Sequence, residues 1–237
     1  TDFYDQFATA NPYELRFTDS NGTRMLNYEI ERWSTTSNSY AWVQVPTLAS
    51  SNDYIWAYWG NAAATSRPPC IPHGATWASR PAGVWHLAET NLLDEEMYGV
   101  NRDSTANTND GVQYRSGPTA GVIAGAQNFD GTNDYLDCGT QPSLDVGEVR
   151  TVSAWIKPTA MVAYAGVVAK ATSGRRDPCT YKMCCHSDGT LYAGDMTAWR
   201  ISANRIVTGT WYHVAYQTKG DGYINFYVNG QLANAGS

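Results

Sequence analysis

Alternation of apolar and polar residues near the C-terminal end of the chain constrains the fold more than any other feature. Between Ile224 and Asn229 every second residue is apolar, which is the two-residue period of a β-strand with one buried face. Asn229 and Gly230 form the pair that favours a tight turn between antiparallel strands. The run 211–215, just upstream, has the composition of a partner strand. We predict an antiparallel pair whose second strand buries Ile224, Phe226 and Val228.

The composition of the 237 residues favours an all-β protein. Aromatic residues make up 13% of the chain and charged residues only 16%. Amphipathic runs with the period of a helix are nearly absent, and the best is residues 91–97. A chain of this length can form one large domain or two smaller ones with a sizeable core. We predict an extracellular β-protein, secreted or surface-displayed, rather than a helical cytosolic enzyme.

Charge and hydrophobicity exclude two classes of partner. The formal net charge is −6 and the chain has no basic stripe, so we expect no nucleic acid as a partner. No apolar run approaches the ~18 residues typical of a membrane helix, so we expect no membrane span. The chain begins at Thr1 without a visible signal peptide, which we interpret as a mature form or an excised fragment.

Cysteine usage points to an oxidising compartment. The cysteines are Cys70, Cys138, Cys179, Cys184 and Cys185. An odd number leaves one unpaired, and Cys138 alternates in phase with Leu136, which predicts a buried free thiol. Cys179 with Cys184 or Cys185 would close a short disulfide loop, and Cys70 could take the remaining partner. The alternative is a zinc site that includes His186, although the cysteine spacing differs from the usual two-residue gap.

The first part of the chain contains four predicted strands, at residues 14–19, 25–33, 41–46 and 53–61. This series resembles a bacterial domain of unknown function, the DUF2341 type, which commonly precedes laminin-G-like modules in large secreted proteins. The resemblance covers nearly all of residues 13–61 and implies no activity. We predict a small β-sandwich module over residues 1–62. A Pro-rich linker should follow at 63–82, because its clustered prolines forbid a regular helix or a central strand.

The second part carries five motifs in order, at residues 83–89, 103–111, 126–136, 152–158 and 211–231. Together they resemble the laminin-G-like, concanavalin A-like lectin/glucanase domain over about residues 83–231. The resemblance implies a β-sandwich of the jelly-roll type, used mostly for glycan or protein recognition and only in some families for catalysis. It also implies core positions for the aromatic residues of these motifs, namely Trp85, Phe129, Trp155 and Trp211.

The expected jelly roll spans residues 83–237 and lacks the last strand or two that the family usually has after residue 231. An open sheet edge is a pairing hazard that a neighbouring strand resolves. We therefore expect either a piece of a longer chain or edges completed by neighbouring domains or by homo-assembly.

A mixture of aromatic and polar residues around a probable hairpin forms the candidate ligand site. Sugars present apolar faces to aromatic rings and hydroxyl groups to polar side chains, which fits the general pattern of small-molecule sites. The candidate residues are Tyr181, His186, Asp188, Tyr192, Trp199 and Arg200, with Asp195 nearby. The alternative interpretation is that Tyr181, Tyr192 and Trp199 simply pack on a sheet face.

Two acidic loops are candidate sites for a structural Ca²⁺ ion. Calcium prefers several carboxylate, amide and backbone oxygen atoms in flexible geometry. The candidate ligands are Asp103, Asp110, Asp130 and Asp134. Ordinary turn formation is the competing explanation, because Asp side chains hydrogen-bond to the backbone of turns.

The sequence favours binding over catalysis. A retaining glycosidase needs two carboxyl groups roughly 5–5.5 Å apart, and no strand carries such a pair in a glucanase-like pattern. We predict a non-catalytic, carbohydrate-binding module that recognises a polysaccharide or a glycoprotein glycan. The first alternative is a structural or adhesion building block of a surface layer, a filament or a virion. The second is a glycan-degrading enzyme.

Overall fold

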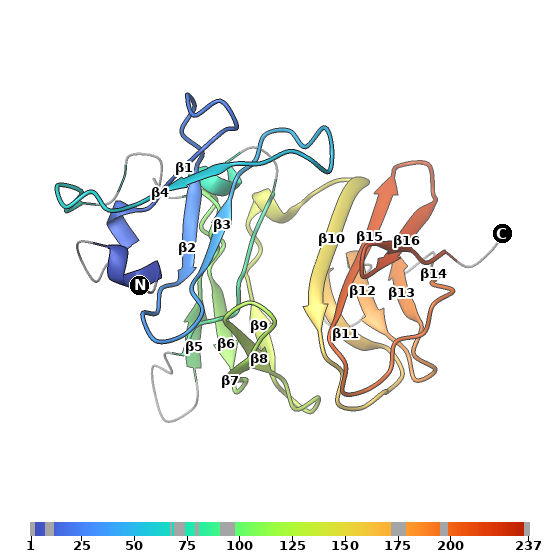
Figure 1. Cartoon of the computed structure of the whole chain (residues 1–237). Coiled ribbons are helices and arrows are strands. Elements are labelled where there is room, and N and C mark those ends of the chain that lie inside the picture. The colour runs from blue at the N-terminus through green and yellow to red at the C-terminus, as the bar shows by residue number, and fades with distance from the viewer. Residues whose placement is uncertain are drawn as a thin grey trace. The chain divides into compact units, whose positions relative to one another are not determined.

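The computed structural model describes residues 3–7, 12–66, 68, 74–78, 81–90, 98–171, 179–194 and 199–234. Contacts divide the chain into two compact units, Thr1–Gly139 and Thr140–Ser237 (Figure 1). The helices of the described residues are short 3₁₀ turns, η1 Phe3–Gln6, η2 Pro12–Glu14, η3 Ala75–Trp77 and η4 Pro142–Leu144. In that part of the chain no helix could cross a membrane. The remaining regular structure is β-strand, so the predicted all-β fold is confirmed.

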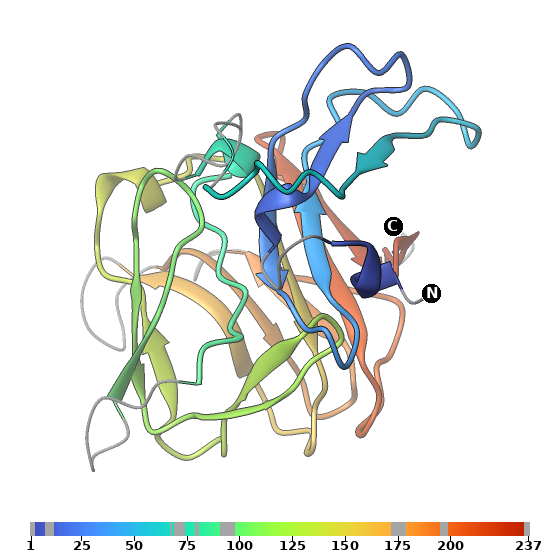
Figure 2. The same ribbon diagram turned by 60° about the vertical axis from the view of Figure 1, so that its left-hand side comes forward.

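The leading part of unit 1 contains two small antiparallel sheets (Figure 2). Its strands are β1 Arg16–Thr18, β2 Tyr28–Arg32, β3 Tyr40–Val43 and β4 Trp56–Tyr58. Strand β1 pairs with β4, and β2 pairs with β3. Tyr28 and Leu26 lie in the core of this part, and the hydroxyl of Tyr28 donates to the carbonyl of Leu15. Strands β1, β2 and β4 fall inside segments that the sequence predicts, and β3 begins one residue before the predicted segment 41–46.

The rest of unit 1 adds a three-stranded sheet and a hairpin. The sheet contains β5 Tyr98–Asn101, β6 Gly111–Tyr114 and β9 Tyr135–Asp137, and the hairpin contains β7 Gly117–Ala120 and β8 Gly125–Asn128. By its contacts, this part belongs to the same compact unit as the leading strands. The Pro-rich linker at residues 63–82, between the two modules expected from the sequence, stays a prediction.

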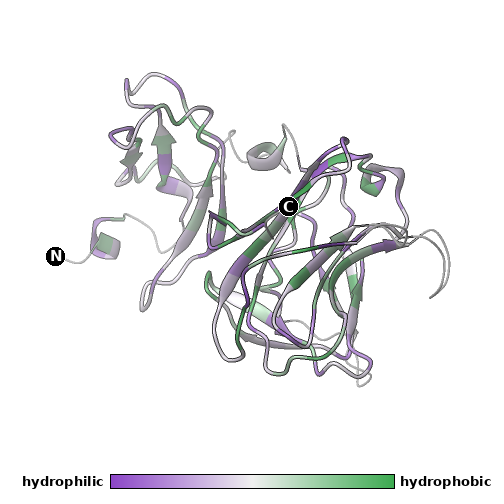
Figure 3. Cartoon of the chain, turned by 90° about the vertical axis from the view of Figure 1, so that its right-hand side faces the viewer, coloured by the Kyte–Doolittle hydropathy of each residue, from purple (hydrophilic) through white to green (hydrophobic). Residues whose placement is uncertain are grey.

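Unit 2 is built from two four-stranded antiparallel sheets. The first contains β10 Val149–Ile156, β15 Tyr212–Lys219, β16 Ile224–Val228 and β17 Gln231–Leu232. The second contains β11 Ala165–Ala171, β12 Cys179–Cys185, β13 Leu191–Gly194 and β14 Trp199–Ile201. Hydrophobic and hydrophilic residues alternate along β16, and Figure 3 colours the ribbon by the hydropathy of each residue. The core lies between the inner faces, where Met183 and Leu191 of one sheet join Val214 and Phe226 of the other.

The predicted hairpin near the C-terminal end is confirmed. Val214 lies opposite Val228 and Tyr216 lies opposite Phe226 in the antiparallel ladder of β15 and β16. The turn after β16 has φ angles of +51° at Asn229 and +77° at Gly230. Positive φ at both positions is what a primed turn requires, and the pair Asn-Gly tolerates it. The sequence therefore predicts both the antiparallel pairing of β15 with β16 and the turn that joins β16 to β17.

Two core positions implied by the family resemblance are wrong. Trp155 is 46% exposed and Phe129 is 40% exposed. Along β10 the buried face contains Val152, Ala154 and Ile156, which pack on the core. Trp155 is one residue out of phase with them, so it points to the outer face of its sheet. Trp85 and Trp211 are partly buried, and Nε1 of Trp85 donates to the carbonyl of Asn109 (2.8 Å).

The described cysteines do not form the expected short disulfide. Cys184 and Cys185 are buried free thiols, and Cys138 is a partly buried free thiol as predicted. Burial raises the pKa of Cys138 to about 12 and that of Cys185 to about 11. Such thiols are poor nucleophiles because the reactive form is the thiolate. Cys70 and the side chain of Cys179 lie outside the described residues.

Candidate functional site

The candidate site lies on the outer face of the β11–β14 sheet, which points away from the core. In the ladder Lys182 lies opposite Gly194, which in turn lies opposite Trp199. Tyr192 belongs to the neighbouring row, opposite Cys184. Residues directly opposite each other share a face of the sheet. Because Met183, Leu191 and Ala193 face the core, the side chains of Lys182, Tyr192 and Trp199 are on the other face.

Four rings meet on this face, and we call them the ring cluster: Tyr164, His186, Tyr192 and Trp199. The centroid of the Tyr164 ring lies 5.0 Å from that of His186 and 5.6 Å from that of Tyr192. Trp199 lies 6.2 Å from both tyrosines. These separations are typical of aromatic contacts that fix ring orientation. Tyr164 is 52% exposed, so the cluster has a solvent-facing aromatic surface.

Asp188 organises the hairpin that carries His186. Its Oδ1 accepts hydrogen bonds from the hydroxyl of Thr190 (2.6 Å) and from the backbone N–H of Thr190 (3.0 Å). Nδ1 of His186 lies 3.3 Å from the same oxygen, and Nη2 of Arg205 lies 4.0 Å from Oδ2. The hydrogen bonds from Thr190, followed by His186 and the charge of Arg205, lower the pKa of Asp188 to about 2.

The structure brings together four of the six predicted ligand-binding residues, His186, Asp188, Tyr192 and Trp199. Tyr181 does not join them, because it is in the core and its hydroxyl donates to the carbonyl of Leu144 (3.1 Å). Arg200 does not join them either. It follows Trp199 on β14, so it belongs to the opposite face, and its Nη2 donates to the carbonyl of Gly222 (3.2 Å). Asp195 lies outside the described residues.

Two residues of the site are absent from the sequence prediction. Lys182 alternates in phase with Cys184, so a strict two-residue reading of β12 would have placed it on the outer face. Tyr164 precedes β11 and has a φ angle of +59°, which is rare for a residue with a side chain. It reaches His186 across 22 positions of sequence, and no local pattern signals that contact.

The carboxylate of Asp103 accepts hydrogen bonds at both oxygen atoms from protein donors. Oδ1 accepts from the backbone N–H groups of Val84 and Thr105, both at 2.9 Å. Oδ2 accepts from the hydroxyl of Thr105 (2.9 Å) and the backbone N–H of Asn109 (3.0 Å). A carboxylate offers about four acceptor sites, and all of them are used here. The backbone N–H of Asp103 in turn donates to Asp110 (2.9 Å).

The other acidic loop also uses its carboxylates for turns. Oδ1 of Asp130 accepts from the backbone N–H of Thr132 (2.7 Å), and the backbone N–H of Asp130 donates to Asp134 (2.8 Å). Among the residues that the structure describes, no group of three or more His, Cys, Asp or Glu side chains could hold a metal ion. Calcium at Asp103, Asp110, Asp130 and Asp134 stays a prediction.

A second chemically unusual cluster lies in unit 1 around His86. Its Nε2 lies 3.4 Å from Oε2 of Glu29, and its Nδ1 lies 3.1 Å from Oε2 of Glu31. The His86 ring stacks on Trp42, with centroids 5.3 Å apart. Nε1 of Trp42 donates to Glu31 (2.9 Å) and Nε1 of Trp77 donates to Glu29 (2.5 Å). We call these five residues the His86 cluster, and they join β2 and β3 to residues 77–86.

The His86 cluster shifts the pKa values of its three ionisable groups. Burial alone would raise the pKa of Glu29, but hydrogen bonds from His86, Trp77 and Ser104 hold it below its ordinary value. Burial raises the pKa of Glu31 more than Trp42 and His86 lower it. Burial would lower the pKa of His86, yet the hydrogen bond to Glu29 and the charges of Glu31, Glu29 and Glu89 raise it.

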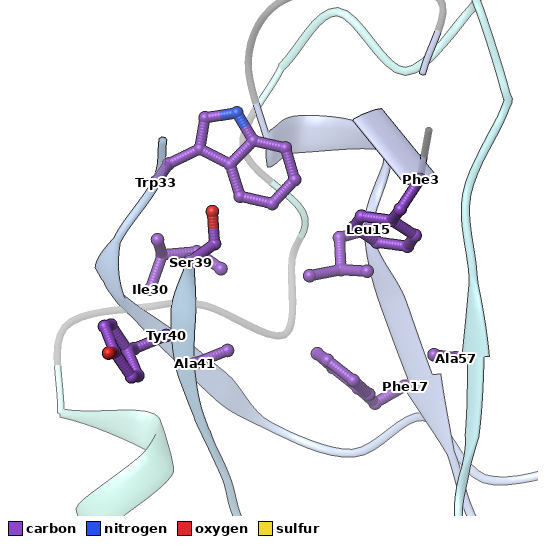
Figure 4. Close-up of a pocket in the computed structure, with 9 residues that line it drawn as sticks. All are labelled: Phe3, Leu15, Phe17, Ile30, Trp33, Ser39, Tyr40, Ala41 and Ala57. Atoms are coloured by element: carbon purple, nitrogen blue, oxygen red, sulfur yellow. The ribbon is translucent and has the colours of Figure 1, made fainter. Parts of the chain in front are cut away.

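An apolar pocket of about 180 Å³ lies between the two small sheets of unit 1 (Figure 4). Phe3, Phe17, Ile30 and Trp33 are among its lining residues. Most of the lining is apolar, and its hydroxyl groups belong to Ser39 and Tyr40. The hydroxyl of Ser39 accepts a hydrogen bond from Tyr4 (2.8 Å) and donates one to the carbonyl of Ser34. A sugar needs polar groups that are still available to bind its hydroxyls, so this pocket fits a sugar less well than the ring cluster does.

Comparison with known families agrees with the architecture. Residues 130–237 match the family described as the concanavalin A-like lectin/glucanases superfamily. Residues 11–69 match a domain of unknown function, DUF2341. No curated protein and no solved structure matches the chain. The superfamily match includes all strands of unit 2 and so the whole ring cluster. The chain is thus similar to the DUF2341 family over residues 11–69 and to the concanavalin A-like lectin/glucanases superfamily over residues 130–237.

Proposed function

We propose that the ring cluster of unit 2 binds carbohydrate and that the domain is a non-catalytic recognition module. The observation that carries this proposal is the meeting of Tyr164, Tyr192 and Trp199 on the outer face of a sheet, next to His186. Aromatic faces contact the apolar faces of sugar rings, while a few polar groups fix orientation. The similarity of residues 130–237 to a superfamily of lectins and glucanases supports the same proposal.

The chemistry around the rings favours binding over hydrolysis. Glycosidases pair two carboxyl groups, one of which must be protonated to act as a general acid. In the described part of the site Asp188 is the carboxylate in contact with the ring cluster, through His186. Its pKa of about 2, caused first by the hydrogen bonds from Thr190, keeps it ionised at neutral pH. An acid of this kind cannot protonate a leaving group efficiently.

The shape of the site also suggests how affinity arises. Tyr164 is 52% exposed at the sheet face, so the contact of a single sugar with the rings should be weak. Linked copies of such a module gain affinity through effective concentration. The proposal therefore assigns the chain to the outside of the cell, where polysaccharides and glycoprotein glycans are displayed in repeated form.

The test is a glycan array followed by affinity electrophoresis with variants of the full chain. Tyr192→Ala and Trp199→Ala should abolish retention on the bound glycan. Trp155→Ala is the matched control, because Trp155 is exposed on the other sheet, where its ring contacts that of His213 at a tilt, with centroids 5.4 Å apart. Thermal unfolding checks that each variant folds. Retention that survives both ring substitutions would contradict the proposed site, and a folded protein that binds no glycan would favour the assembly function instead.

A further inference from the structure

One cation is built into the ring cluster. Lys182 and Trp199 lie in the same row of the sheet with Gly194 between them. Because Gly194 has no side chain, the lysine can extend across it, and its Nζ lies 5.8 Å from the centroid of the Trp199 ring. A cation at this distance from an indole face is held by the ring quadrupole. The ammonium group therefore has a fixed place at the edge of the aromatic surface.

No carboxylate among the described residues forms an ion pair with Lys182. In that part of the chain, the ion pairs of this region link Asp188 to His186 and to Arg205. Lys182 is also only partly buried, so an anion in solution can reach it. An ammonium group next to an aromatic surface, with no ion-pair partner among the described side chains, is suited to an anion carried on a stacked ring.

We propose that the ring cluster prefers an acidic sugar unit, whose ring stacks on Trp199 and Tyr192 and whose carboxylate or sulfate pairs with Lys182. This inference rests on the proposed carbohydrate-binding function and narrows its ligand class. The positive charge of Arg205, whose Nη2 lies 4.0 Å from Oδ2 of Asp188, weakens the repulsion that this carboxylate exerts on an anion. The shared chemistry is a single anionic group beside a hydrophobic ring face.

The experiment compares ligands that differ only in charge. Oligogalacturonate and its methyl ester present the same sugar ring with and without a carboxylate, and a sulfated galactan with its desulfated form does the same for sulfate. Isothermal titration of the full chain should show about tenfold tighter binding of at least one anionic form, because a charge-assisted hydrogen bond adds roughly 1.4 kcal/mol. Added salt should reduce this preference.

Two variants of Lys182 assign the preference to this residue. Lys182→Met keeps a long apolar side chain over Trp199 and removes the charge, so it should bind anionic and neutral forms equally. Lys182→Arg should retain the preference, and Lys219→Met, at an exposed lysine of β15, should leave it unchanged. Equal binding of charged and neutral forms by the wild-type chain would overturn this inference and leave the proposed function standing. A preference that survives in Lys182→Met would overturn it too, whereas no binding of any glycan would overturn both proposals.

Discussion

Nδ1 of His86 lies 3.1 Å from Oε2 of Glu31, a carboxylate whose side chain is 3% exposed. This contact joins strand β2 of the leading domain to the segment that follows the expected linker. A buried carboxylate needs a partner, because an uncompensated buried charge is strongly destabilising. The leading strands therefore depend on His86 for stability, and unit 1 should fold and unfold as one cooperative body.

The first prediction is that the stability of unit 1 depends on pH through the His86 cluster. The raised pKa of His86 gives stability that is complete below its unfolded value of about 6.5 and is lost as pH rises through the folded value. The lowered pKa of Glu29 gives stability that is present above its unfolded value and is lost as pH falls through the folded value. Both contributions are complete between the unfolded pKa values of 4.5 for Glu29 and 6.5 for His86, so stability should be greatest in that pH range.

Urea unfolding across this pH range, with Trp fluorescence as the probe, measures the effect. The raised pKa of Glu31 makes the loss of stability at acidic pH smaller, because burial favours the protonated form of this side chain. His86→Gln should remove the loss on the alkaline side, and His213→Gln in unit 2 is the control. A wild-type profile that stays flat from pH 6 to 9 would contradict this assignment.

The second prediction concerns the saturated carboxylate of Asp103. Asp103→Asn replaces an acceptor with an amide whose N–H₂ would face the donors of Thr105 and Asn109. We expect a loss of about 2–4 kcal/mol in the free energy of unfolding, because several buried donors lose their partner. Asp130→Asn, in an exposed loop, should cost less than about 1 kcal/mol. Similar losses for both variants, measured by urea unfolding, would show that Asp103 has no special role.

The third prediction concerns Lys170, which is 8% exposed and whose Nζ has no hydrogen-bond partner among the described residues. Oδ1 of Asp145, on a largely exposed side chain, lies 3.7 Å from this Nζ. Lys170→Met keeps the volume and removes the buried charge, so it should leave stability unchanged or raise it by about 1 kcal/mol. Thermal unfolding compares it with Lys219→Met. A clear loss of stability would mean that the ion pair with Asp145 outweighs the burial of the charge.

The fourth prediction concerns the turn at Asn229. Its Oδ1 accepts from the backbone N–H of His213 (2.9 Å), and its φ angle is +51°. Asn229→Ala removes this hydrogen bond and disfavours the left-handed conformation, at a cost of about 2 kcal/mol. Asn229→Gly removes only the hydrogen bond, so it should cost about 1 kcal/mol. Equal stability of the two variants in chemical unfolding would remove the conformational part of this explanation.

These examples show which features follow from sequence. The hairpin at Asn229 was predictable because period and turn chemistry are local properties of consecutive residues. The predicted core position of Trp155 is wrong, because the prediction rests on the family motif and not on the alternation of residues along the strand itself. A strict alternation from Ala154 and Ile156 would have placed it outside.

The candidate site divides in the same way. Successive residues of a strand point to opposite faces of the sheet, so Trp199 and Arg200 lie on different faces, as do Lys182 and Tyr181. The sequence alone could therefore have excluded Arg200 and Tyr181 from the site and included Lys182. Contacts such as Tyr164 with His186 or Glu31 with His86 join segments distant in sequence, and only the packed structure reveals them. The same holds for the saturation of Asp103, which a list of acidic residues cannot show.

The most direct test of the central claim is an NMR titration of the chain labelled with ¹⁵N at tryptophan. The sequence has nine Trp residues, and Trp199→Phe assigns the indole signal of the ring cluster. On addition of a glycan found by the array, we predict that the Trp199 signal shifts in a saturable way while the Trp155 signal stays in place. A shift confined to Trp155 or to the tryptophans of unit 1 would contradict the assignment of the ring cluster as the carbohydrate-binding site.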